Sequence, residues 1–220
     1  GYTVTLPNNA MFSLEGMGHV GFKYTDFDIL ARVILEDYTL TVNADSPWQT
    51  VEDFINDAKA NPGKYKIGFS GVGSSTHIVS LALADAFGYE AEQVPYKGGA
   101  KAVAACMGGH IDGLTNHPGE VISGVQAGKL RTLATTGAER SRLMPDVPTF
   151  KEAGLDFVVS QWRGVATPKG ASEEVKAAWK KALQEAVKDP QFIEVAEEKM
   201  GATISLAFDE ELDAFVKAMA

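Results

Sequence analysis

Short apolar runs alternate with helical patterns along most of the chain. Between the runs, apolar residues recur at helical spacing, for example at Val51, Phe54, Ile55 and Ala58. Alternating strands and helices predict a mainly parallel, doubly wound α/β sheet. Runs rich in β-branched and aromatic residues predict strands at residues 2–6, 38–43, 66–70, 92–96, 111–115, 130–136, 157–166 and 202–206.

Local signals mark where the predicted helices begin and end. Thr50 can cap a helix that stops before Pro62, and the helix after the third strand ends at Gly88. Thr149 and Glu152 have the spacing of a capping box. Two further helices are predicted, one from about residue 172 to 189 and one from residue 209 onward.

The order of these elements predicts two lobes. Residues 44–136 form a nearly complete series of strands and helices, whereas the last helices need a sheet that only residues 2–6 and 202–206 supply. We therefore expect residues 1–40 to form part of lobe 1 and residues 41–137 to form lobe 2. Residues 138–220 then return to lobe 1 and add the C-terminal helices.

Composition excludes several classes of protein. The net charge of −9 and the pI near 4.9 argue against nucleic acid or an anionic membrane as the main partner. No apolar run approaches the about 18 residues needed to cross a bilayer, so we expect no membrane insertion. Cys106 has no partner for an internal disulfide, and no Cys or His pair has the spacing of a zinc site.

The stretch KIGFSGVGSSTH, residues 66–77, carries the clearest chemistry. A strand runs into a turn in which Gly71 and Gly73 allow close approach of a ligand, and Ser74, Ser75 and Thr76 add hydroxyls at a helix N-terminus. Such a loop favours an anion. It lacks the Lys of a P-loop and the third Gly of a dinucleotide fingerprint, so a small carboxylate fits better. The alternative interpretation is an ordinary capped turn.

Three other strand ends carry polar or turn residues, and they are Asn8-Asn9, residues 97–99 and residues 116–118. Because parallel α/β sheets bind ligands at the carboxyl ends of their strands, these ends and the loop predict a shared cleft. Trp162 is expected to serve packing, while Arg163 could pair with a ligand carboxylate or form an ion pair within the protein.

Four stretches together resemble a known family. They are GFSGVGSSTH, VPYKGGAKAVAACMGGHID, AGKLRTLATTGAERS and MPDVPTFKEAGLDF, in this order, and VPYKGG with PDVPT is the most diagnostic combination. The chain resembles the extracytoplasmic substrate-binding proteins of tripartite tricarboxylate transporters, also called Bug proteins. Relatives begin with a further strand, a Gly-rich loop and a helix before the match to Gly1, so we expect this chain to lack an N-terminal segment.

The resemblance implies an α/β protein with a type II periplasmic-binding-protein fold, in which two doubly wound lobes are joined by crossing hinge strands. It also implies a periplasmic, monomeric protein without cofactor or catalytic residue, which captures a small di- or tricarboxylate between its lobes and delivers it to membrane permease subunits. The ligand-binding residues that we predict are Asn9, Ser70, Gly71, Val72, Gly73, Ser74, Ser75, Thr76, Tyr96 and Asn116.

Two features bear on the ligand and on rival functions. Asn116 falls where many relatives carry Asp, and an uncharged amide there disfavours an amino-acid ligand. The first rival is a ligand-sensing module for a histidine kinase. The second is a hydrolase that uses Ser74 or Ser75 with His77, although the chain has no G-x-S-x-G elbow.

Overall fold

A computed structural model describes residues 3–219 of the protein. The contacts of the chain separate unit 2, Asp37–Ser160, from unit 1, which contains the described residues on either side of it. We expected the chain to return to the first lobe at residue 138, whereas unit 1 resumes only after Ser160. Residues 138–160 stay with unit 2 because the rings of Phe150 and Phe157 pack against Phe87, with centroids 5.7 and 5.9 Å from its ring.

Among the described residues, unit 2 contains a five-stranded sheet in the order β4-β3-β5-β2-β6. Strand β3 pairs in parallel with β4 and β5, and β2 runs antiparallel to both of its neighbours, β5 and β6. The predicted parallel arrangement is therefore confirmed for β3, β4 and β5. The bounds are β2 Thr39–Asn43, β3 Lys66–Phe69, β4 Glu92–Pro95, β5 Gly113–Asn116 and β6 Leu130–Thr135.

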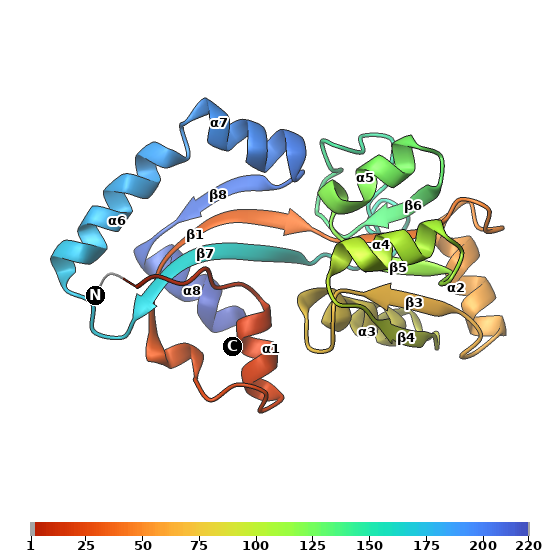
Figure 1. The fold of residues 1–220 in the computed structure, drawn as a ribbon, viewed down its shortest axis with the longest axis horizontal. Helices are drawn as coiled ribbons and strands as arrows, with labels where there is room; N and C mark the ends of the chain where they lie inside the picture. Colours follow the sequence, from red (N-terminus) through yellow and green to blue (C-terminus); the bar gives the residue numbers. More distant parts are fainter. Residues whose placement is uncertain (1–2, 220) are drawn as a thin grey trace. The chain divides into compact units, whose positions relative to one another are not determined.

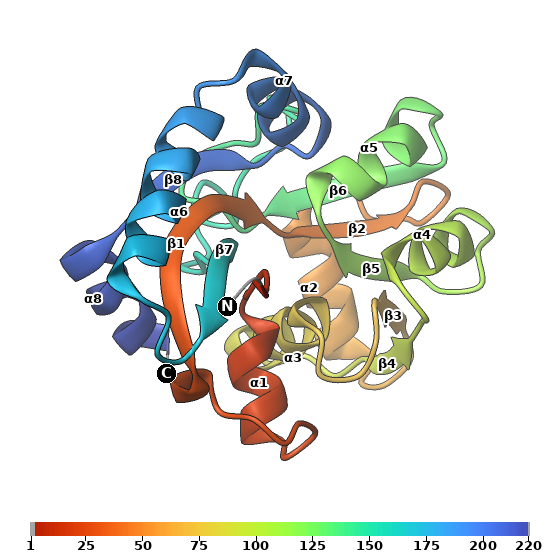
Figure 2. The ribbon, with the colours of Figure 1, turned by 60° about the vertical axis from the view of Figure 1, so that its left-hand side comes forward.

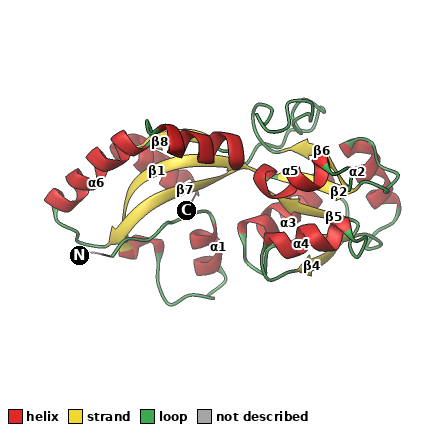
Figure 3. Ribbon diagram, turned by 45° about the horizontal axis from the view of Figure 1, so that its top comes forward, coloured by secondary structure: helices red, strands yellow, loops and turns green. Residues whose placement is uncertain are grey.

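Helices cover both faces of this sheet (Figures 2 and 3). Apolar residues of α2 and α3 form one buried cluster with Leu40 and Ile67, while α4 and α5 form another with Leu114 and Leu130. The predicted cap of α2 is confirmed, because the Thr50 hydroxyl accepts a hydrogen bond from the Asp53 amide. The helices are α2 Val51–Ala60, α3 Ser75–Phe87, α4 Gly99–Met107 and α5 Pro118–Gln126.

Unit 1 contains, within the described chain, a three-stranded sheet in the order β7-β1-β8, with β1 and β8 antiparallel (Figure 1). Its strands are β1 Phe27–Asp37, β7 Ser160–Pro168 and β8 Thr203–Ala207. Its helical segments are α1 Ala10–Gly16, the 3₁₀ turn Tyr24–Asp26, α6 Glu173–Ala186, α7 Pro190–Ile193, the π-helical turn Glu194–Lys199 and α8 Asp209–Met219.

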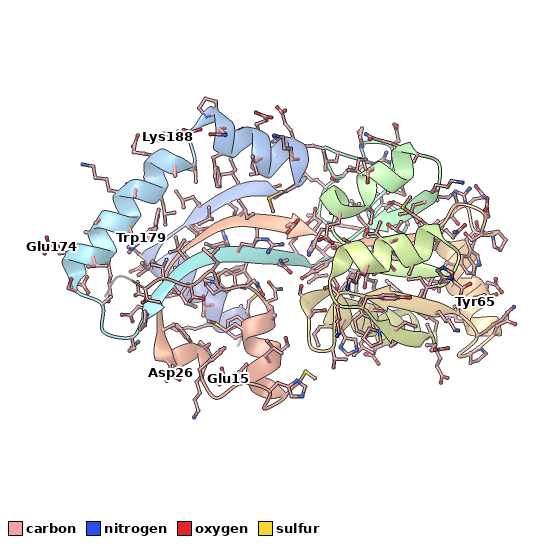
Figure 4. The ribbon with its side chains drawn as sticks, in the orientation of Figure 1. Glu15, Asp26, Tyr65, Glu174, Trp179 and Lys188 are labelled. Atoms are coloured by element: carbon pink, nitrogen blue, oxygen red, sulfur yellow. The ribbon has the colours of Figure 1, made fainter. Side chains whose placement is uncertain are left out.

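Each face of the unit 1 sheet has its own apolar cluster. On one face, Val165 of β7 packs with residues of α6, among them Leu183 and Trp179, which Figure 4 labels. On the other face, the fully buried ring of Trp162 lies between Phe12 of α1 and Phe215 of α8, at centroid distances of 6.4 and 5.9 Å. The expected packing role of Trp162 is thus confirmed.

The structure differs from the sequence-based elements in several places. Residue 2 of the strand predicted at residues 2–6 lies outside the described residues, and residues 3–6 form only an isolated bridge between Thr5 and Ala166, because Pro7 has no N–H with which to continue a ladder. Residues 149–152 form the hydrogen bonds of a capping box but continue as a turn, not a helix. Strand β1 and helix α1 were not predicted. No helix among residues 3–219 combines the length and apolar character needed to cross a membrane.

Arg163 forms an ion pair inside unit 1. Its Nη2 and Nε donate to one oxygen of Glu36 at 2.6 and 3.0 Å, and the Glu36 side chain is 5% exposed. A buried carboxylate needs such a partner to offset its loss of hydration. Of the two roles considered for Arg163, the structure shows the ion pair.

We expect Arg163→Ala to lower the free energy of unfolding by about 1–3 kcal/mol, because it removes the two guanidinium donors from the buried Glu36 carboxylate. The matched control is Arg140→Ala, which breaks a pair with Glu152 in which both side chains are nearly half exposed, and it should cost less than about 1 kcal/mol. Urea unfolding of both variants measures the difference, and equal losses would contradict the role given to Glu36.

Candidate functional site

The loop after β3 is shaped by two glycines and a capped helix. Gly71 and Gly73 have φ values of 127° and 77°, which residues other than glycine rarely adopt. The turn closes through a hydrogen bond from the Ser74 amide to the Gly71 carbonyl at 3.1 Å. Ser74 then caps α3, since its hydroxyl accepts from the His77 amide. The chain therefore turns directly from strand to helix at this point.

The Thr76 hydroxyl lies at the centre of this loop. It accepts a hydrogen bond from the Ser70 amide at 3.0 Å and lies 2.8 Å from the Ser70 hydroxyl and 3.0 Å from the Ser74 hydroxyl. The Thr76 side chain is buried. Its carbonyl accepts from the Thr115 hydroxyl on β5 at 2.8 Å. Thr76, predicted to face a ligand, thus holds the loop in shape, together with the hydroxyls of Ser70 and Ser74.

Backbone amides of the same loop supply donors. The amides of Gly71 and Val72 donate no hydrogen bond to any residue in the described part of the chain, whereas the Gly73 amide donates to His77 Nδ1 at 3.2 Å. The Val72 side chain is exposed, and Ser75 is the half-buried first residue of α3. Two N–H groups in a rigid turn at a helix N-terminus form a suitable receptor for an anion.

His77 is held as a neutral ring. It stacks on Phe69 with a centroid distance of 4.2 Å, and burial lowers the pKa of His77. Because Nδ1 accepts from the Gly73 amide, the ring carries its proton on Nε2. The Ser74 hydroxyl meets the backbone amide of His77 and not the ring. This arrangement does not support the hydrolase hypothesis, in which Nδ1 or Nε2 would accept a proton from a serine.

The end of β4 lies beside this loop. The Tyr96 amide donates to the Phe69 carbonyl of β3 at 2.9 Å, and the half-buried Tyr96 ring covers Gly68. A methyl group on Gly71 would lie 3.7 Å from the Tyr96 carbonyl, so loop and strand end are neighbours. The structure thus brings Tyr96 and the loop together.

Asn116 closes β5 with a buried amide. Its side chain is 1% exposed, and Oδ1 accepts from the His117 amide at 2.9 Å. Nδ2 is buried and has no hydrogen-bond partner among residues 3–219. A buried donor without an acceptor costs about 1–3 kcal/mol, and an acceptor on a ligand at the end of β5 would satisfy this one.

Asn9 belongs to unit 1, apart from the other predicted residues, which all belong to unit 2. It precedes α1, and its Oδ1 accepts from the Trp162 amide at 2.9 Å. Asn9 therefore links the start of α1 to β7. A role toward a ligand stays a prediction for this residue.

Three helices add their dipoles to the edge where the parallel strands end. Helices α3, α4 and α5 start within a few residues of the carboxyl ends of β3, β4 and β5, and these strands are direct neighbours (Figure 1). Helix N-termini carry partial positive charge and unpaired N–H groups. Within residues 3–219, no group of three or more His, Cys, Asp or Glu side chains could hold a metal ion. The edge is thus suited to a small anion held by neutral donors.

Two α/β units, one of which carries such an edge, are typical of solute-binding proteins. The family model described as "Tripartite tricarboxylate transporter family receptor", TctC, matches residues 1–207. The chain therefore belongs to this family of receptors, and its resemblance to it is confirmed.

A curated relative is the UPF0065 protein in the gbd 5′ region of Cupriavidus necator, 34% identical over 169 residues, which are 77% of this chain and 51% of the relative. The chain thus spans about half the length of that relative.

Solved structures share the fold. The periplasmic binding protein BugD is 27% identical, with a TM-score of 0.88 over 99% of this chain and 74% of BugD. MatC from Rhodopseudomonas palustris, solved with bound malate, is 21% identical, with a TM-score of 0.84 over 99% of this chain and 76% of MatC. At that identity the likeness to MatC shows the fold alone. The predicted type II periplasmic-binding-protein fold is confirmed.

We expect the stability of the protein to fall as the pH drops below about 6.5, the ordinary pKa of histidine. The pKa of His77 is lower in the folded state than in the unfolded state, so the unfolded state takes up the proton first and stability rises with pH in this window. Unfolding at pH 7 and 5.5 should show a smaller pH dependence in His77→Gln than in the wild type. The control is His19→Gln, on an exposed turn, which should keep the wild-type pH dependence of stability. The same pH dependence in His77→Gln as in the wild type would contradict the role of His77.

Proposed function

We propose that this protein is an extracytoplasmic receptor that captures a small di- or tricarboxylate and delivers it to the permease subunits of a tripartite transporter. The observation that carries the proposal is the set of unpaired donors at the end of the parallel strands. The amides of Gly71 and Val72 and the buried Nδ2 of Asn116 have no acceptor within the described residues. A carboxylate has acceptor sites enough to satisfy several of them.

The chemistry of the loop suits a carboxylate. Each oxygen of a carboxylate can accept two hydrogen bonds, and bonds to a charged acceptor are stronger than neutral ones. A micromolar ligand requires about 8 kcal/mol, which a few such bonds and the buried area of a small acid can supply without an arginine. A role of Asn9 toward the ligand stays a prediction.

Binding without reaction is the second part of the proposal. Nδ1 of His77 accepts from the Gly73 amide, and the Ser74 hydroxyl meets the His77 backbone and not its ring, so this pair does not have the geometry of a serine activated by a histidine. The family consists of receptors, and MatC, one protein of this fold, carries malate. These points support a ligand that arrives and leaves unchanged. Delivery to permease subunits and a periplasmic location follow from the family and are proposed on that ground.

Calorimetric titration with citrate, malate, succinate, glutamate and benzoate tests this function. We expect saturable binding of at least one di- or tricarboxylate, with the acid recovered intact after dialysis. Consumption of the acid would indicate an enzyme, and the absence of binding by any of the acids would contradict the proposal.

We expect Gly71→Val to weaken binding of the best acid by at least about tenfold. A valine at a φ of 127° forces the turn to change, and its side chain occupies the space beside the amides that bind the carboxylate. The control Gly128→Val introduces the same kind of strain at a φ of 65° in the turn after α5, where nothing lies within 4 Å. Unchanged affinity in Gly71→Val, or an equal loss of affinity in both variants, would show that the loop does not bind the ligand.

A further inference from the structure

Gly99 lies beside two polar side-chain groups that have no hydrogen-bond partner among residues 3–219. A methyl group built on Gly99 would lie 2.8 Å from Nδ2 of Asn116 and would collide with Oε2 of Glu120. Both groups therefore flank the same point at the start of α4. The Asn116 amide is a donor and the Glu120 carboxylate is an acceptor, and no hydrogen bond joins them in the described structure.

The two groups differ in their freedom to move. Asn116 is 1% exposed and fixed by the bond from its Oδ1 to the His117 amide. Glu120 lies in the first turn of α5 and is exposed, and its carboxylate forms no hydrogen bond or ion pair with any residue from 3 to 219. A carboxylate in a first turn also stabilises its helix, but that role alone does not account for the unpaired, buried Nδ2 beside it.

We propose that Asn116 and Glu120 together recognise a hydroxyl group on the bound acid, so that the receptor prefers hydroxycarboxylates to their deoxy counterparts. This inference rests on the proposed function. A hydroxyl can accept from Nδ2 and donate to the carboxylate at the same time, which satisfies both groups. The Glu120 carboxylate lies over Gly99, where another residue would place its side chain, and because it is exposed it can turn to admit the hydroxyl.

Other substituents satisfy only part of this pair. An ammonium group donates to Glu120 but cannot accept from Asn116, so the buried amide stays unpaired. A methylene group does neither. A second carboxylate can accept from Asn116 but is repelled by Glu120. A site that hydrogen-bonds a substrate hydroxyl discriminates against the analogue that lacks it, because the polar groups of the site are then left unpaired.

Paired acids test this inference by calorimetry. L-malate is compared with succinate and citrate with tricarballylate, since each pair differs only by the hydroxyl. We expect the wild type to bind at least one hydroxy acid about tenfold or more tightly than its deoxy counterpart. Glu120→Ala and Asn116→Ala should each reduce this ratio to less than about threefold, while Glu120→Ala should keep or improve the affinity for the deoxy acid.

The control and the unfolding measurements separate a binding role from a structural one. Glu92→Ala removes an exposed carboxylate at the first residue of β4, the opposite end of the strand, and should keep the wild-type ratio. Thermal unfolding without ligand shows whether each variant is folded. If Asn116→Ala does not fold, Glu120→Ala alone decides.

Each outcome bears on a single claim. Equal binding of both members of each pair by the wild type, or an unchanged ratio in folded Glu120→Ala, would overturn the inference and leave the proposed function standing. The absence of binding by all four acids would instead contradict the proposed function. A ratio that falls in Glu120→Ala and not in Glu92→Ala is the result that the inference predicts.

Discussion

The site of this receptor depends on one buried hydroxyl. Thr76 joins the backbone of Ser70 to the cap residue Ser74, and the Thr115 hydroxyl fixes the Thr76 carbonyl to β5. The loop between β3 and α3 is thereby attached at both of its ends. The amides of Gly71 and Val72 project from a backbone that has already lost its freedom, so little further conformational entropy is lost when a ligand binds.

Neutral donors and helix dipoles give this site its character. The only arginine considered for the ligand, Arg163, is paired with Glu36 inside unit 1, where the ion pair compensates a buried charge. Amides hold an anion through geometry more than through net charge, which suits a receptor that must also release its ligand. The exposed Glu120 near Asn116 adds the one negative charge that, by our proposal, distinguishes among acids.

The sequence predicted much of this architecture and less of the site. Strands β3 to β6 and helices α2 and α3 were predicted from the spacing of apolar residues and from the residues that cap the helices. Strand β1 was missed because Arg32, Glu36 and Asp37 interrupt its apolar pattern, and the partner of the buried Glu36 lies far away in the sequence. The loop was found, but sequence cannot show which hydroxyls face inward, so Thr76 was assigned to the ligand. The sequence could not predict that Asn116 and Glu120 meet beside Gly99, because this proximity depends on how α4 and α5 pack.

The most direct test follows the backbone amides of the ¹⁵N-labelled protein during titration with the tightest-binding acid. The account predicts that the Gly71 and Val72 signals shift with the same saturation curve as the calorimetric binding, while the proton spectrum of the acid shows no product. Saturable binding that leaves both signals in place, or a new species derived from the acid, would contradict it.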